Sequence, residues 1–361
     1  MEPLKEMFNL VYYKKLVKVL SSVHSRLDAR SLLNQLTAGM EERSLNERLS
    51  HTSLVLGHFL PPDFKSALAI LDKTIPAMDP GYTALVFPDF VARFGLDHFE
   101  AAMDALKRYT VYGSSEFAVR HFLKKDFDKT IHRMKAWAFD ANPHVRRLAS
   151  EGSRPRLPWS FKLDTVIKDP RSTTPILEAL RADPELYVKK SVANHLNDIS
   201  KDHPDYMLSL LNRWDRANSH TAWIARHASR SLVKKGYAPA LRLFDAMEGA
   251  QVRLSRISLS PTTLPIGGSV RFQFYLRSDS DKDQKLIIDY VVEYRKKMGG
   301  LSPKVFKLKE FILSKGKEIL ITKNHIMKDY TTRKHYPGRH LLHIQVNGKI
   351  MASTSFHLTR S

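Results

Sequence analysis

Apolar residues recur at intervals of three and four along the first two thirds of the chain, which is the spacing of helices that bury one face. Residues 64–75 (FKSALAILDKTI), 98–110 (HFEAAMDALKRYT) and 204–214 (PDYMLSLLNRW) show this spacing clearly. Turn-forming clusters such as Asp79-Pro80-Gly81 interrupt it. The pattern therefore predicts an all-α region that extends to about residue 248.

From residue 249 onward, apolar and polar residues alternate, as they do in strands that bury one face. Seven runs show this alternation: VRLSRISLS, SVRFQFYLR, KLIIDYVVEYR, KVFKLKEFIL, EILITKN, RHLLHIQVNG and KIMASTSFHLT. Seven short strands in succession are typical of an antiparallel immunoglobulin-like sandwich. We therefore expect a multidomain α + β protein, with an all-α HEAT-like repeat solenoid in residues 1–248 and an all-β immunoglobulin-like sandwich in residues 249–361.

One eight-residue pattern occurs three times in the helical region, at 144–151 (HVRRLASE), 187–194 (YVKKSVAN) and 223–230 (WIARHASR). The separations of 43 and 36 residues are typical of HEAT-like helix pairs that stack into a solenoid. Stacking predicts that the cations of the three copies align on one concave face and bind a DNA backbone, the alternative being ordinary solvated helix faces. These cations are Arg146, Arg147, Lys189, Lys190 and Arg226.

The charge indicates a polyanionic partner. The 361 residues include 58 Lys and Arg against 37 Asp and Glu, a formal net charge of +21, and such a field favours nucleic acid over an acidic membrane surface. Residues 249–361 hold 21 of the basic and 8 of the acidic residues. We therefore expect the sandwich to clamp a phosphate backbone, with a solubilising appendage as the alternative.

The composition also excludes several classes of site. The chain has no cysteine, which excludes disulfides, iron–sulfur clusters and thiol catalysis. Its 16 histidines occur in no HExxH or comparable spacing, so a catalytic metal is not expected. The absence of a long apolar run and of a signal-peptide pattern predicts a cytoplasmic protein, in the bacterial cytosol or nucleoid, with no membrane partner.

An unusual chemical grouping follows the first copy of the repeat, in residues 142–159 (NPHVRRLASEGSRPRLPW). Glu151 stands at the end of the predicted helix, and the Arg-Pro-Arg-Leu-Pro-Trp segment after it is expected to be extended. The other two copies carry Asn194 and Arg230 at the position of Glu151. Since the repeat itself requires no carboxylate there, this segment is the predicted active site.

Three segments resemble the AlkC/AlkD family of DNA alkylation-repair glycosylases: RLASEGSRPRLPW at 147–159, SSEFAVRHFL at 114–123 and VKKSVANHLNDISKDHPDYMLSLLNRW at 188–214. The appended basic sandwich makes the chain more similar to the AlkC branch, and the resemblance covers essentially the whole chain. It implies excision of cationic N-alkylated bases, such as 3-methyladenine or else 3-methylcytosine, from double-stranded DNA in base excision repair. It also implies that no cofactor and no deep base-flipping pocket are needed.

The chemistry of that reaction agrees with the residue types in the predicted site. An N3-alkylated base is already positively charged, so it departs as a neutral molecule without a general acid. The protein must supply negative charge beside an oxocarbenium-like sugar and position a water molecule. No lysine stands out as a Schiff-base nucleophile, which favours a monofunctional glycosylase. The alternative from another class is a non-enzymatic HEAT-repeat DNA-binding or scaffold protein.

Four residues are the candidate catalytic residues. Glu151 is expected to stabilise the sugar cation and orient water, unless it only pairs with neighbouring arginines. Glu116 is the second carboxylate because of the resemblance, its alternative being an acid in the first turn of a helix. Asp198 is either a third acid near the lesion or a local partner at a helix end. Trp159 is expected to lie against the sugar or the base.

Further residues are expected to contact DNA. Arg154 and Arg156 are assigned to phosphate oxygens in forked geometry, and Trp223 is a weaker candidate, whereas Trp137 and Trp214 are expected to pack in the core. In the sandwich, the loop 330–340 and the run 294–297 are candidates for a DNA groove, or else plain strand connections. The loop contributes Arg333, Lys334 and Arg339, with Tyr330 and Tyr336. A monomer suffices for this arrangement.

Overall fold

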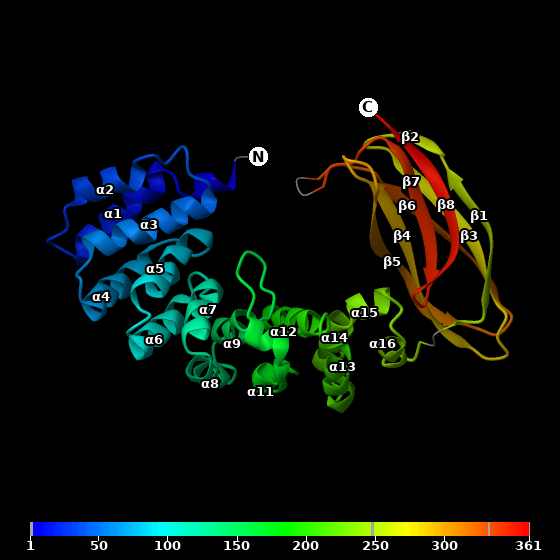
Figure 1. Cartoon of the computed structure of the whole chain (residues 1–361), viewed down its shortest axis with the longest axis horizontal. Helices are drawn as coiled ribbons and strands as arrows, with labels where there is room; N and C mark the ends of the chain where they lie inside the picture. Colours follow the sequence, from blue (N-terminus) through cyan, green and yellow to red (C-terminus); the bar gives the residue numbers. More distant parts are fainter. Residues whose placement is uncertain (1–2, 247–248, 331–332, 361) are drawn as a thin grey trace. The chain divides into compact units, whose positions relative to one another are not determined.

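The structure, a computed structural model, describes residues 3–246, 249–330 and 333–360. Helices occupy the described chain as far as Arg242, and strands occupy it from Val252 onward (Figure 1). The predicted α + β fold class is therefore confirmed. The α-helices are α1 (Leu10–Val23), α2 (Ala29–Thr37), α3 (Leu45–Phe59), α4 (Phe64–Thr74), α5 (Val86–Phe94), α6 (Phe99–Tyr109), α7 (Glu116–Lys125), α8 (Phe127–Trp137), α9 (Pro143–Gly152), α10 (Asp164–Lys168), α11 (Thr174–Ala179), α12 (Leu186–Ile199), α13 (Pro204–Arg213), α14 (Ser219–Ala228), α15 (Arg230–Lys234) and α16 (Ala238–Arg242). Short 3-10 helices are η1 (Leu4–Met7), η2 (Ile75–Ala77), η3 (Tyr82–Leu85) and η4 (Pro170–Thr173).

Local capping explains where several helices begin. The Asp63 carboxylate accepts a hydrogen bond of 2.8 Å from the backbone N–H of Ser66 at the start of α4. At the start of α9, the Asn142 side chain accepts a hydrogen bond of 2.9 Å from the backbone N–H of His144. Such bonds satisfy amides that have no partner inside the helix.

The described chain forms two compact units, one of Met1–Asp202 with Trp214–Ala228 and one of His203–Arg213 with Ser229–Ser361. We call them the helical unit and the sandwich unit. The secondary structure changes near residue 248, as the sequence pattern predicts, but α13, α15 and α16 belong to the sandwich unit by their contacts.

Stacked helices build the helical unit. Helices α3, α5, α7, α9, α12 and α14 each contact the next and form one row, and α1, α4 and α6 lie in a second row beside it (Figure 1). The three copies of the eight-residue pattern fall on α9, α12 and α14, which are consecutive members of the first row. The stacking that the repeat predicts is therefore confirmed for these helices.

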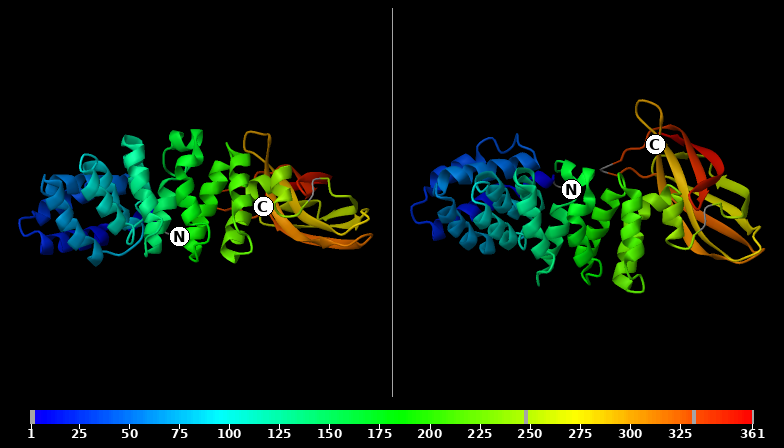
Figure 2. Two further views of the ribbon diagram at one scale, coloured as in Figure 1. Left: turned by 90° about the horizontal axis from the view of Figure 1, so that it is seen from below. Right: turned by 60° about the horizontal axis from the view of Figure 1, so that its bottom comes forward.

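Two sheets, antiparallel except for one short strand, build the sandwich (Figure 2). Their orders are β1-β3-β6 and β2-β8-β7-β4-β5, with β2 parallel to β8. All seven predicted strands are present, and the short β2 is an addition. The strands are β1 (Val252–Ser260), β2 (Thr263–Pro265), β3 (Ser269–Ser278), β4 (Gln284–Arg295), β5 (Leu301–Leu313), β6 (Glu318–Ile326), β7 (Gly338–Val346) and β8 (Lys349–Thr359).

The core of the sandwich lies between the sheets, where Phe272 and Phe274 of β3 meet Tyr290 and Val292 of β4. On the outer face of β4, Ile287 packs against Leu241 and Ala246, which lie in and just after α16. This cover explains why β4 is buried on both faces for most of its length. The short helices before the sandwich are therefore part of its packing.

Candidate active site

An open cleft of about 490 Å³ lies in the helical unit beside α7 and α9. The carboxylates of Glu116 and Glu151 and the indole of Trp159 line it, together with Arg147 and Tyr187. Three of the four predicted catalytic residues therefore share one cleft, although they come from different segments of the chain. Among the helices in the described residues, none is long and apolar enough to cross a membrane.

Glu151 is buried near the C-terminal end of α9, and its two carboxylate oxygens have different partners. Oε1 accepts a hydrogen bond of 2.7 Å from Nη1 of Arg154, and Oε2 accepts one of 2.6 Å from the Ser191 hydroxyl of α12. The guanidinium of Arg147 lies 3.6 Å from Oε1. These contacts fix the orientation of the carboxylate and supply positive charge beside it.

Gly152 allows α9 to approach α7. A Cβ atom at this position would lie 2.5 Å from Cγ1 of Val119, closer than real side chains pack. Glycine therefore lets the end of α9, with Glu151, pack directly on the helix that begins with Glu116.

Arg154 connects Glu151 to Asp198, and both Arg154 and Asp198 are buried. Nε and Nη2 of Arg154 lie 2.9 and 2.8 Å from Oδ2 of Asp198, and Lys201 lies 2.9 Å from Oδ1. Burial alone would lower the pKa of Arg154, but the two carboxylates raise it above its usual value. Asp198 is absent from the residues that line the cleft, and Arg154 connects it to Glu151, which does line it.

Glu116 is the first residue of α7 and accepts a hydrogen bond of 2.6 Å from the Ser114 hydroxyl. Arg147 pairs with the same carboxylate and also donates to the Ser114 hydroxyl at 2.7 Å. Its guanidinium carbon lies 4.8 Å from the centre of the Tyr187 ring. Arg147 therefore holds Glu116 and lies close to Glu151 on the same side of the cleft.

The loop after α9 presents Trp159 to solvent. Trp159 is 76% exposed and has a left-handed backbone, with φ of 64°, and the segment before it forms turns. The prediction of an extended segment is therefore wrong. Arg120, buried in α7, fixes the loop by donating to the carbonyl oxygens of Gly152 at 3.0 Å, Arg154 at 2.7 Å and Phe161. Burial lowers the pKa of Arg120 to about 10, with a further contribution from the charge of Arg154.

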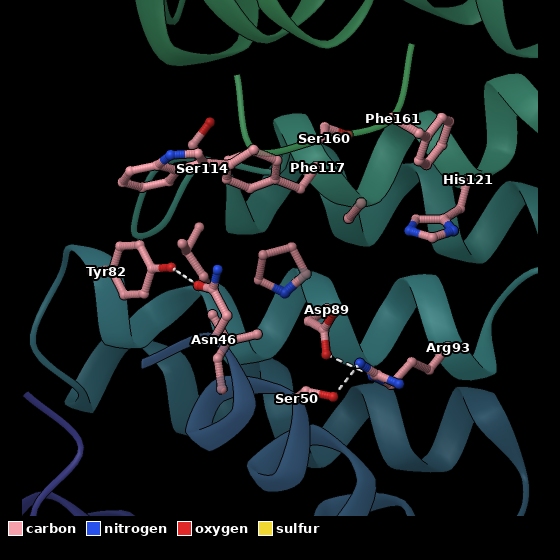
Figure 3. A pocket seen from close by; sticks show the side chains of 15 residues that line it. Asn46, Ser50, Tyr82, Asp89, Arg93, Ser114, Phe117, His121, Ser160 and Phe161 are labelled. Atoms are coloured by element: carbon pink, nitrogen blue, oxygen red, sulfur yellow. Dashed lines mark hydrogen bonds and ion pairs between the residues drawn. The ribbon is translucent and has the colours of Figure 1, made fainter. Parts of the chain in front are cut away.

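A second pocket of about 480 Å³ adjoins the cleft and shares Tyr82, Phe117 and Trp159 with it (Figure 3). Figure 3 shows Tyr82, Phe117 and Phe161 around this pocket, and polar contacts on the side of Asn46 and Arg93. The Tyr82 hydroxyl donates to Asn46, and Arg93 lies 2.6 Å from Asp89. The exposed indole of Trp159 therefore lines both the cleft that holds Glu116 and Glu151 and this second pocket.

Several of the predicted DNA contacts have partners inside the protein. Nε of Arg146 lies 2.6 Å from Asp183, and Nζ of Lys189 lies 2.9 Å from Nδ1 of His220. The predicted stripe of five cations is therefore incomplete, because these two side chains connect neighbouring segments and Arg147 pairs with Glu116. The remaining two, Lys190 and Arg226, lie at exposed positions. The reason is positional: Arg146 and Lys189 hold equivalent places that face the adjacent repeat.

The two forked arginines after α9 also bind carboxylates of the chain. Arg154 pairs with Glu151 and Asp198, and Nη2 of Arg156 lies 2.8 and 2.9 Å from the two oxygens of Asp202. The forked geometry expected for phosphate is thus used within the protein. Nearby, Trp223 is half-buried and stacks on His227 with ring centres 3.7 Å apart. Trp137 and Trp214 are buried, as predicted.

In the sandwich unit, the predicted cations lie near the start of β7. Lys334 and Arg339 are exposed, and Arg333 lies over the Tyr294 ring at 5.0 Å. Tyr330 is exposed and Tyr336 half-buried. Their contact with DNA stays a prediction.

Sequence reasoning missed residues of α7 and α12 that hold either the Glu151 carboxylate or the backbone around it. Arg120 and Ser191 belong to this set, as does His195 of α12, whose Nδ1 lies 3.0 Å from the Ser150 carbonyl oxygen. Burial lowers the pKa of His195 to about 3, so the imidazole is neutral. The sequence did distinguish Ser191, because the second copy of the repeat has this serine at the position where the first copy has Leu148. In the described residues, no group of three or more His, Cys, Asp or Glu is arranged to hold a metal ion.

Known proteins resemble this chain along its length. Residues 87–232 match the family model described as "DNA alkylation repair enzyme", and residues 253–360 match the C-terminal Ig-like domain of the uncharacterised protein YhaZ. The uncharacterized protein YhaZ of Bacillus subtilis (strain 168) is 40% identical over 359 residues, which are 99% of this chain and 100% of that protein. The structure of Pseudomonas fluorescens alkylpurine DNA glycosylase AlkC, bound to DNA containing an abasic site analog, is 45% identical with a TM-score of 0.95. That match covers 99% of this chain and 100% of AlkC.

These matches cover both the helical unit, with its carboxylate-lined cleft, and the Ig-like domain of this chain. The chain belongs to the DNA alkylation repair enzyme family. Within that family it falls in the AlkC branch.

Proposed function

We propose that the protein is a monofunctional DNA glycosylase that excises cationic N-alkylated bases, 3-methyladenine first among them, from double-stranded DNA. The observation that carries this proposal is the meeting of Glu116, Glu151 and Trp159 at one open cleft. The match to AlkC over the whole chain supports the same reaction class. Such an enzyme would work in the cytoplasm, where bacterial DNA lies, and one copy of the chain would suffice.

The reaction needs stabilisation of positive charge more than acid catalysis. As the bond between the base nitrogen and C1′ breaks, its electron pair neutralises the cationic base and leaves positive charge on the sugar. Glu151 stabilises that charge, and its carboxylate is already oriented by Arg154 and Ser191. A preorganised charge of this kind requires little rearrangement in the transition state.

Water then completes the reaction at C1′. Its oxygen forms the new bond to carbon, and its proton passes to a carboxylate of the cleft or to solvent, which leaves an abasic site. Glu116 is the second carboxylate available for positioning the water, and Trp159 offers an exposed aromatic face to the sugar cation. Because the cleft is open, the lesion can be approached without deep burial of the base.

Each unit offers cations for the DNA backbone. In the helical unit these are the exposed Lys190 and Arg226, and in the sandwich unit Arg333, Lys334 and Arg339. Arg146, Arg154, Arg156 and Lys189 are assigned instead to holding the protein around the cleft, because their side chains are buried or half-buried and pair within the protein.

The test is release of 3-methyladenine from methylated duplex DNA by the purified protein, followed by chromatography of the free base. We expect release above a heat-denatured control and a matching number of abasic sites. Duplex binding without release of any alkylated base would instead favour the non-enzymatic DNA-binding alternative. Parallel substrates that carry 3-methylcytosine would define the range of bases.

A further inference from the structure

One apolar side chain of the sandwich unit stands at the tip of a hairpin and contacts almost nothing in the protein. Met298 lies in the turn between β4 and β5 and is 94% exposed. In Figure 2 (right view) this turn is the gold loop that projects from the sheets. A side chain so exposed contributes little to packing, and single apolar residues on a surface are by themselves ordinary. The surroundings of Met298 make this one unusual.

The turn that carries Met298 has a defined geometry. The backbone N–H of Gly299 donates to the carbonyl oxygen of Lys296, and the N–H of Lys296 donates to that of Gly300, both at 3.1 Å. Gly299 and Gly300 have φ of 82° and 71°, a left-handed region that glycine adopts without strain. Met298 is therefore held at the end of an ordered two-stranded ribbon.

Exposed cations surround this tip. Arg295, Lys296 and Lys297 precede Met298, and β4 pairs with β7 so that Glu293 lies opposite Leu341. This register places Arg339 at the same end of the sandwich as Arg295 and the hairpin tip. We call Arg295, Lys296, Lys297, Lys334 and Arg339 the basic end.

A hollow of about 310 Å³ lies at the base of the hairpin tip. Arg295 and Arg339 line it, with Gly299, Gly300 and Leu301. At Gly338 a Cβ atom would lie 2.7 Å from the Arg295 side chain, so glycine leaves room for that arginine to cross the start of β7. The two guanidinium groups fit a phosphate, because arginine binds phosphate oxygens in forked geometry.

Cations around a projecting apolar side chain match a duplex chemically. Phosphates flank each groove, and proteins that bind the minor groove often insert a Met, Leu, Ile or Phe side chain between base pairs. We infer that the β4–β5 tip is a wedge: Arg295 and Arg339 hold a backbone phosphate while Met298 enters the minor groove and unstacks one base step. This role rests on the proposed binding of duplex DNA and adds a residue that acts through stacking rather than charge.

The experiment uses the full chain and an undamaged duplex containing 2-aminopurine, whose fluorescence rises when it is unstacked. Met298→Ala should weaken duplex binding by about tenfold, the effect of leaving most of one methionine side chain unburied. It should also abolish the fluorescence increase while the dependence of binding on salt stays unchanged, because an apolar side chain releases no counterions. Met298→Leu should retain both signals.

Two variants provide matched controls. Ile312→Ala removes an apolar side chain that is 66% exposed at the other end of β5, and it should change neither signal. Arg339→Ala should lower the slope of log affinity against log salt by about 0.9, the loss of one phosphate contact, without changing the fluorescence of the bound duplex.

The results separate this inference from the proposed glycosylase activity. If Met298→Ala leaves both signals unchanged, or if wild-type protein binds the duplex without unstacking it, the wedge is overturned even where 3-methyladenine is released. A lower salt slope in Met298→Ala would overturn it as well, since the side chain would then act through backbone contacts. Loss of unstacking in Met298→Ala would support the wedge even for a protein that releases no base.

Discussion

The carboxylate cluster of the cleft and the basic end of the sandwich unit both gather charged residues, but their environments differ. Beside the cleft, Glu151 and Asp198 are buried, and both pair with the buried Arg154. At the basic end, Lys334 and Arg339 are exposed. Buried charges are little screened by salt and are fixed in place, which suits stabilisation of a transition state. Exposed cations exchange counterions for phosphates, which suits binding.

The comparison shows why charge alone does not distinguish a cation paired inside the protein from one that is open to a ligand. Arg154 and Lys334 look alike in a sequence, yet one sits between two carboxylates and the other faces solvent. If the contrast is correct, variants in the cluster should affect catalysis and stability, whereas variants at the basic end should affect salt-dependent affinity.

The largest effect is expected for Glu151→Gln. Loss of the negative charge beside the sugar should lower the excision rate by about 10²- to 10³-fold, as removal of a preorganised electrostatic group does in other enzymes. Affinity for DNA should stay within a few-fold. Single-turnover excision and duplex titration measure the two quantities. Glu185→Gln, an exposed carboxylate just before α12, is the matched control, and a large loss of affinity in Glu151→Gln would assign Glu151 to structure.

The buried imidazole of His195 should make the helical unit sensitive to acid. Its pKa is about 3 when folded and about 6.5 when unfolded, so below pH 6.5 the unfolded chain binds the extra proton. This group should therefore lower the free energy of unfolding by about 2 to 3 kcal/mol between pH 7 and pH 4.5.

Urea unfolding of His195→Gln at the two pH values tests this sensitivity. The variant should lose less stability than wild type on acidification. His58→Gln, at an exposed position of α3, should behave like wild type. Equal acid sensitivity in wild type and His195→Gln would contradict the prediction.

Asp198→Asn and Asp202→Asn compare the contribution of a buried ion pair to stability with that of a more exposed one. Asp198→Asn leaves the buried Arg154 with one charged partner, so the free energy of unfolding should fall by about 2 kcal/mol. Excision should fall too, because Arg154 orients Glu151. Asp202→Asn removes the partner of Arg156, in a pair that is more exposed, and should change stability by less than about 1 kcal/mol. Similar losses in the two variants would show that burial does not distinguish the pairs.

Trp159→Ala tests the exposed aromatic face of the cleft. The indole makes little contact with the protein, so stability should not change, whereas excision should slow by about tenfold through loss of the cation–π contact with the sugar. Phe139→Ala, also exposed at 78%, is the control. An unchanged excision rate in Trp159→Ala would remove the indole from the proposed mechanism.

The smallest effect is expected at the basic end. Lys334→Gln should lower the slope of log affinity against log salt by about 0.9. Lys349→Gln, at the first residue of β8 and opposite the far end of β7, should leave it unchanged. Fluorescence anisotropy over a range of salt concentrations gives both slopes. Point variants suit this test better than deletion of residues 249–361, which would uncover the packing of Ile287 on Leu241. Equal slopes for wild type and Lys334→Gln would place that lysine away from the phosphates.

Much of the fold could be predicted because periodicity is a local property. The spacing of apolar residues located α4, α6 and α13, and alternation located the seven long strands. The short β2 was missed because three residues are too few to show alternation. The grouping of α13 with the sandwich unit was missed because it depends on contacts between segments distant in sequence.

The candidate site was predicted in part. Glu151 departs from the repeat pattern, Trp159 ends the unusual segment that follows it, and the resemblance to a known family indicated Glu116. The left-handed backbone at Trp159 was not predicted, because it depends on the carbonyl contacts that Arg120 makes from another helix.

The sequence by itself determined the two kinds of secondary structure, the repeat and the excess of basic residues, since each follows from residue type and spacing along the chain. Only the tertiary structure decided which charges are available to a ligand. Packing of α9 on α12 directs Arg154 toward Glu151 and Asp198, and strand register brings Arg339 beside Arg295. Whether a cation forms an ion pair or stays open to solvent depends on the groups that folding places within a few ångströms of it. Its neighbours along the chain do not specify those groups.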